Sequence, residues 1–282
     1  ALRGVGHRRQ EDAGPRPGLT LTRNEHDSLD DLLRATAKRK TSAASARAAG
    51  QTGAVESSKD AFLSSCSRVS ESFADAGYRY AKSGPHMSRK RGHFKFTVSF
   101  QTSTHNIPGE HVHLGLAARA ESQLLKKWRA SRKCVYRSDG WIAGGISNAF
   151  VGEATPVSWD VVDPETRDAT CADIASYARE HFLPWFALFD DPEALIDRLA
   201  RENVPAFGWL SLGDPIEFAL CFGDTDRAHR VFQRLVRRSE ADLDSVRELV
   251  QTYRREGLPG VFHGRYTDQL AQLIVVHDLP LF

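Results

Sequence analysis

The sequence lacks several features that mark whole classes of protein. Its four cysteines in 282 residues, Cys66, Cys134, Cys171 and Cys221, form no C-x-x-C pair. Such wide spacings predict neither a disulfide framework nor a cysteine-bound zinc ion, so reduced thiols are expected. No apolar run approaches the roughly 18 residues of a membrane-spanning helix. The first 30 residues also lack the apolar block of a secretory signal. We therefore expect a cytoplasmic protein without a membrane partner.

Catalytic motifs are missing as well. The chain contains no G-x-S-x-G, H-E-x-x-H, G-x-x-x-x-G-K-[ST] or G-x-G-x-x-G pattern. No spacing nominates a base for a cysteine nucleophile. The sequence therefore predicts no cofactor and leaves the catalytic residues unassigned, so whether the protein is an enzyme stays open.

Aromatic residues are absent from residues 1–58, which are rich in Ala, Arg, Ser, Gly and Thr. Such a segment buries too little apolar surface to offset its ordering entropy, which predicts a disordered tail. We expect a helix and an antiparallel sheet over 59–160, and a helical C-terminal region packed on that sheet over 161–282. Helices are predicted at 59–76, 121–131, 171–189, 192–203, 215–222, 225–239, 241–256 and 267–277.

The strongest local signal is the two-residue alternation of FKFTVSFQ at 94–101. Four large apolar side chains, beginning with Phe94 and Phe96, point to one side, and Lys95, Thr97, Ser99 and Gln101 point to the other. Alternation returns at 110–118 after the turn residues NIPG at 106–109, and a second hairpin is predicted within 133–147. Helix, strands and then many helices indicate an α+β fold, an antiparallel sheet packed on helices and followed by a mostly helical C-terminal part.

Charge is unevenly distributed along the chain. Residues 76–138 carry 13 Lys and Arg against 2 Asp and Glu, whereas residues 139–282 carry 13 against 24. The basic and acidic segments either face each other within one fold or leave a basic surface for an anionic partner. The predicted binding surface is the polar sheet face, rimmed by three basic residues of the preceding turn. Its members are Lys95, Thr97, Ser99, Gln101, His111 and His113, with Arg89, Lys90 and Arg91 as the rim.

Three histidines near this turn raise the question of a metal ion. His111 and His113 are two residues apart on one strand face, which is a workable geometry for chelating zinc. Pairing around the turn puts Gln101 opposite one of them, and only His105 stands near as a third ligand. We predict no metal site but keep these three histidines as candidates.

One stretch resembles a known family. GYRY at 77–80, the F-x-F-x-V-x-F-Q strand at 94–101, STHN at 103–106 and LPWF at 183–186 carry the likeness. Residues 56–205 resemble the uncharacterised bacterial family with domain of unknown function 4304, in which a charged turn separates the first two strands. The resemblance implies a bacterial α+β domain and supplies no activity.

The function expected from these features is that of a non-catalytic binding module that uses a basic sheet face. Its partner is expected to be an anionic protein. The alternatives are nucleic-acid binding through residues 76–138, and a metal site at His111 and His113.

Overall fold

The computed structural model describes residues 56–132, 138–152, 155–207, 212–238, 242–258 and 266–280. The predicted tail lies outside these ranges except for its last three residues. Residues 55–282 form one compact unit. In the ranges given above, no helix is both long and apolar enough to span a bilayer.

The predicted first helix is present as α2 (Ser58–Glu71). The Ser57 hydroxyl caps it by accepting the backbone N–H of Asp60 at 3.1 Å. Helical spacing puts Phe62, Cys66 and Val69 on one buried face. This apolar stripe packs the helix against the rest of the compact unit.

The described strands form one antiparallel sheet. They are β1 (Arg79–Ala81), β2 (His86–Arg91), β3 (Phe94–Thr102), β4 (His113–Ser122), β5 (Trp141–Ile146) and β6 (Ser158–Asp160). The order is β1-β2-β3-β4-β5, and β6 pairs with the end of β4 beyond β5. The prediction of an antiparallel sheet in an α+β fold is confirmed. Of the second predicted hairpin, the described part is β5, and residues 133–137 lie outside the described ranges.

The charged turn expected before the strand at 94–101 is wrong, because Arg89, Lys90 and Arg91 belong to strand β2. The turn between β2 and β3 is only two residues long, Gly92 and His93, and pairs Arg91 with Phe94. Gly92 has a φ of 56°, a left-handed value that glycine adopts at the first position of tight hairpin turns. Met87 is the only buried residue of β2, so its sequence shows almost no strand alternation.

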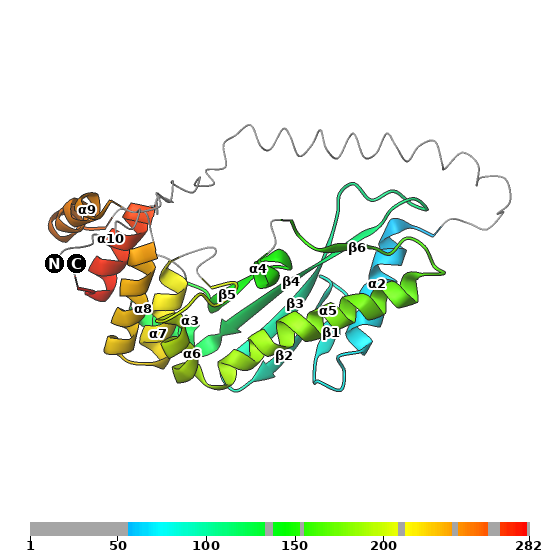
Figure 1. Cartoon of the computed structure of the whole chain (residues 1–282), viewed down its shortest axis with the longest axis horizontal. Coiled ribbons are helices and arrows are strands. Elements are labelled where there is room, and N and C mark those ends of the chain that lie inside the picture. The colour runs from blue at the N-terminus through cyan, green and yellow to red at the C-terminus, as the bar shows by residue number, and fades with distance from the viewer. Residues whose placement is uncertain are drawn as a thin grey trace, which may run out of the picture. The chain divides into compact units, whose positions relative to one another are not determined.

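Apolar side chains of β3 and β4 cover one face of the sheet. Register pairs Phe96 with Ala120, Val98 with Ala118 and Phe100 with Leu116, all of them buried. Helix α5 (Arg167–Ala187) runs along this side of the sheet (Figure 1). Its Phe186 ring centroid lies 4.8 Å from that of Phe96. We call this the covered face.

The C-terminal half is helical, as predicted. After α3 (Gln123–Ser131), α4 (Asn148–Val151) and α5 come a 3₁₀ turn, η1 (Leu188–Asp190), and further helices. These are α6 (Pro192–Leu199), α7 (Gly213–Phe222), α8 (Thr225–Arg238), α9 (Leu243–Glu256) and α10 (Tyr266–His277). Phe218 and Phe222 of α7 pack near Phe94, so these helices share the core of the sheet.

A buried ion cluster also connects α3 to α7. The Arg129 side chain is fully buried and donates through Nε to Glu217 at 2.5 Å and through a terminal nitrogen to Asp214 at 2.9 Å. The Nε2 atom of His277 on α10 lies 3.4 Å from the Glu217 carboxylate. Asp214 precedes Pro215 and so has the sequence of a helix cap, but its carboxylate binds Arg129. Removing one partner from such a cluster leaves an uncompensated buried charge.

Candidate binding surface

The second face of the sheet is polar. It consists of the side chains of β1 to β4 that alternate with those of the covered face, and we call it the open face. Cross-strand rows run from Arg79 through Ser88 and Thr97 to Arg119, and from Lys90 through Lys95 to Glu121. Lys90 and Gln101 are exposed, and Lys95, Ser99 and Ala117 are half-buried. The small residues Ser88, Ser99 and Ala117 lie among these basic side chains.

Of the six residues predicted for the polar face itself, five lie on this face, namely Lys95, Thr97, Ser99, Gln101 and His113. The register differs from the prediction, because Gln101 pairs with Gly115 and not with a histidine. His111 precedes β4 and forms an isolated bridge with Ile107 across the turn. Its ring still meets that of His113, with centroids 3.7 Å apart and planes at 88°.

The predicted basic rim is divided between the two faces. Lys90 pairs with Lys95 and lies on the open face. Arg89 pairs with Phe96, and its guanidinium lies 5.2 Å from the Tyr78 ring centroid on the covered face. Arg91 lies on the same side as Arg89 and forms an ion pair of 2.8 Å with Asp190. Only Lys90 of the three therefore shares a surface with Lys95.

Positive charge on the open face is only partly balanced. Arg79, Lys90, Lys95 and Arg119 stand against one acid, Glu121, whose carboxylate is 3.6 Å from Arg119 Nε. Lys90 and Lys95 form no ion pair with any residue that the structure describes. Like charges directly opposite each other on neighbouring strands are destabilising. The fold thus maintains a repulsive pair on a surface that it does not cover.

The centre of the open face contains two polar atoms that have no hydrogen-bond partner among the described residues. Thr97 is 1% exposed, and its Oγ1 has no hydrogen-bond partner. Arg119 lies directly opposite on β4, and its Nε is buried without a hydrogen bond although the side chain is 40% exposed. Leaving a buried polar atom unsatisfied costs about 1–3 kcal/mol. Burial alone therefore does not explain why a threonine and an arginine occupy these two positions.

Asp160 of β6 organises the histidine end of the face. One carboxylate oxygen accepts the backbone N–H groups of Val112 and Val162 at 3.0 and 3.1 Å, and the other bonds His111 Nδ1 at 2.8 Å. Burial opposes ionisation of Asp160, but these hydrogen bonds outweigh it and hold the pKa of the carboxyl group below its ordinary value.

The described residues do not form a metal-binding site. Among the residues whose positions are described, no group of three or more His, Cys, Asp and Glu side chains is arranged to hold one. His111 Nδ1 is engaged by Asp160, and His105 lies exposed in the turn. One of the two predicted ligands, His111, is thus bound by a carboxylate from a strand distant in sequence.

The thiols give no sign of nucleophilic chemistry. Burial raises the pKa of the Cys66 and Cys171 thiols, and it raises that of Cys221 to about 11. All three are free cysteines, and Cys134 lies outside the described residues. A raised pKa keeps a cysteine in its unreactive thiol form near neutral pH.

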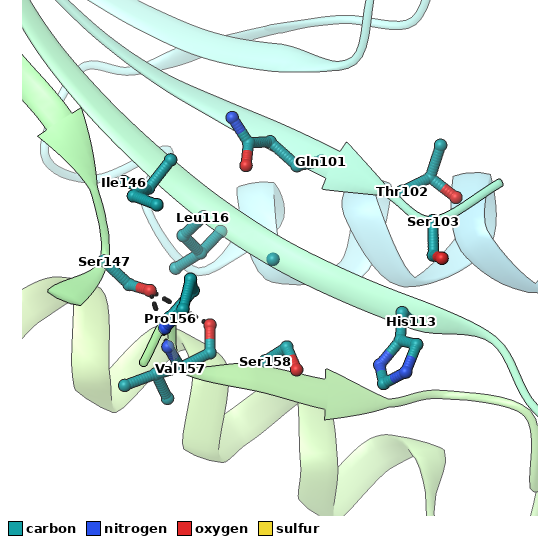
Figure 2. Close-up of a pocket in the computed structure, with 11 residues that line it drawn as sticks. Gln101, Thr102, Ser103, His113, Leu116, Ile146, Ser147, Pro156, Val157 and Ser158 are labelled. Atoms are coloured by element: carbon teal, nitrogen blue, oxygen red, sulfur yellow. Dashed lines mark hydrogen bonds between the residues drawn. The ribbon is translucent and has the colours of Figure 1, made fainter. Parts of the chain in front are cut away.

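A hollow with a volume of about 250 Å³ opens where β3, β4 and β6 meet. Figure 2 shows its lining residues, among them Gln101, Ser103, His113, Ile146 and Ser158. Ser147 closes the floor, since its hydroxyl donates to the Val157 carbonyl at 3.0 Å and accepts the Val157 N–H at 2.9 Å. Gly115 contributes no side chain there. The hollow therefore lies at the end of the open face.

Comparison with protein-family models, curated proteins and solved structures gives no match. The resemblance of residues 56–205 to a bacterial family of unknown function stays a prediction.

Sequence reasoning missed several members of this surface. The alternation that places His113 on this face would also place Arg119 and Glu121 there, but the predicted strand ends at residue 118. Asp160 is not among the predicted residues, because nothing in the sequence connects it with His111, 49 positions earlier. Ser158 was missed for the same reason.

Proposed function

We propose that this chain is a non-catalytic binding module that docks an acidic polypeptide segment on the open face of its sheet. The observation that carries the proposal is the Lys90–Lys95 pair, two cations that face each other on neighbouring strands and form no ion pair with any described residue. A carboxylate placed between them would remove the repulsion and gain two favourable interactions. We place such a module in the bacterial cytoplasm.

An acidic polypeptide suits this face better than a nucleic acid does. Single-stranded nucleic acids bind sheets through aromatic rings on which bases stack. On β1 to β4, the open face carries no Phe, Tyr or Trp, and on β5 a single aromatic residue, Trp141, pairs with Glu121 at the end of the Lys90–Lys95 row. Tyr80 and the phenylalanines of β3 lie on the covered face instead. The small side chains Ser88, Ser99 and Ala117 leave room for an extended main chain between the cations.

The test measures binding of a fluorescent peptide rich in Asp and Glu to the full chain by anisotropy. We expect the affinity to fall as salt rises and to fall about tenfold, equivalent to 1.4 kcal/mol, in the double variant Lys90→Glu with Lys95→Glu. Lys59→Glu on α2 is the matched control, since Lys59 is an exposed lysine remote in sequence from the sheet. Unchanged affinity in the double variant would refute the proposal.

A single-stranded oligonucleotide of equal charge serves as the competing probe. We expect the peptide to bind more tightly at equal ionic strength. If the oligonucleotide binds more tightly and loses affinity in the same double variant, the face is a nucleic-acid surface and the acidic polypeptide is the wrong partner.

A further inference from the structure

The hollow at the end of the open face has the size of a single side chain. Its volume is about 250 Å³, below the roughly 300–1,000 Å³ of pockets that enclose free ligands. A cavity of about 150 Å³ already accepts a benzene molecule. The hollow can therefore receive one aromatic ring but is small for a separate cofactor or substrate.

The two ends of the hollow differ in chemistry. Ile146, Leu116, Pro156 and Val157 lie toward one end, with Ser147, whose hydroxyl is already bonded to the Val157 backbone. Ser103 and His113 lie toward the other end, and Ser158 lies between the two (Figure 2). Such a lining matches a side chain with an apolar body and a hydrogen-bonding tip. Tyrosine has this form, because its ring is apolar and its hydroxyl both donates and accepts.

The hollow is continuous with the open face along β3. Lys95, Thr97, Ser99 and Gln101 point to the same side, and Gln101 also lines the hollow. At about 3.3 Å per residue, the six positions from Lys95 to Gln101 span roughly 20 Å. An extended chain that reaches from the lysine pair to the hollow therefore needs about six residues.

We propose that the hollow receives a tyrosine side chain of the acidic partner, about six residues away from the acids that contact Lys90 and Lys95. This inference rests on the proposed function and adds a sequence requirement to it. The lysine pair supplies salt-dependent attraction, and the hollow selects among acidic segments by the residue that it admits.

Gly115 offers a clean way to close the hollow. A Cβ atom added there would meet the Gln101 Cβ at 3.7 Å, which is ordinary van der Waals contact. The residue is in the middle of a strand, where valine is favoured over glycine. Gly115→Val should therefore fill the hollow and leave the fold intact, which a thermal melt of the variant checks directly.

The experiment uses three acidic peptides that differ at one position, carrying tyrosine, phenylalanine or alanine. For the wild-type chain we expect the tyrosine peptide to bind about tenfold more tightly than the alanine peptide, with phenylalanine between them. Gly115→Val should remove this preference, and Gly115→Ala should reduce it. Ala172→Val is the matched control, an exposed alanine on α5, which packs against the covered face and does not line the hollow.

A second variant tests a polar group of the lining. Ser158→Ala should narrow the difference between the tyrosine and phenylalanine peptides and leave the alanine peptide unchanged. If all three peptides bind alike while binding still depends on salt and Lys95, the tyrosine inference is wrong and the proposed function stands. If none binds even at low salt, both are wrong.

Discussion

Phe96 and Thr97 are neighbours on strand β3, and neither side chain is more than 1% exposed, yet they lie on opposite faces of the sheet. Phe96 is buried by rings from α5 and η1, with centroid distances of 4.8 Å to Phe186 and 5.6 Å to Phe189. Thr97 lies between its cross-strand neighbours Ser88 and Arg119, and its hydroxyl has no hydrogen-bond partner in the part of the chain that the structure describes. Burial of the Phe96 ring therefore stabilises the fold, whereas burial of the Thr97 hydroxyl does not.

The covered face should respond most strongly to substitution. Phe96→Ala removes a fully buried ring and leaves a cavity, so we expect the free energy of unfolding to fall by about 3–5 kcal/mol. Chemical denaturation measures the change. Ser99→Ala on the open face is the control and should stay within about 0.5 kcal/mol. A loss below about 1 kcal/mol for Phe96→Ala would contradict the layer arrangement.

Thr97→Val should act in the opposite direction. The substitution replaces an unsatisfied buried hydroxyl with a methyl group, and valine suits a strand, so we expect a gain of about 1 kcal/mol in unfolding free energy. Thr97→Ser keeps the hydroxyl and should give no gain. Destabilisation by valine would show that the hydroxyl is hydrogen-bonded in solution.

Lys90→Glu should stabilise the chain by roughly 0.2–1 kcal/mol, because it replaces a repulsive cross-strand pair with an attractive one. The gain should shrink as salt rises, since the pair is exposed to solvent. Lys90→Gln removes the repulsion alone and should give a smaller gain. Stability that improves while peptide binding weakens would show that the face retains charge at the expense of stability.

The smallest effect is expected at Asp160, through pH. Its lowered pKa means that its contribution to stability is complete above the unfolded-state pKa, about 3.9, and is lost as the pH falls through the folded-state pKa. Wild-type protein should therefore lose more stability below about pH 4 than Asp160→Asn does. Unfolding free energies measured across the acid range test this, and parallel curves for the two proteins would count against it.

The comparison also shows what local sequence can predict. Large hydrophobes at every second position of 94–101 set the strand and its covered face without reference to any other segment. Strand β2 has Met87 as its only buried residue, so it exists because β3 offers it hydrogen bonds and not because of its own pattern. The Gln101–Gly115 register depends on the intervening loop, and the His111–Asp160 contact depends on β6. Neither can be predicted from the local sequence pattern.

The guanidinium of Arg129 makes the sheet and the C-terminal helices mutually dependent. Its carboxylate partners, Asp214 and Glu217, belong to α7, which also places Phe218 and Phe222 beside Phe94. A chain shortened before α7 would keep the cation and lose its two buried counterions, leaving the exposed carboxylate of Asp139 at 3.6 Å. Dissection of this protein into a sheet fragment and a helical fragment should accordingly yield two insoluble pieces, and heat should melt the intact molecule in one cooperative step.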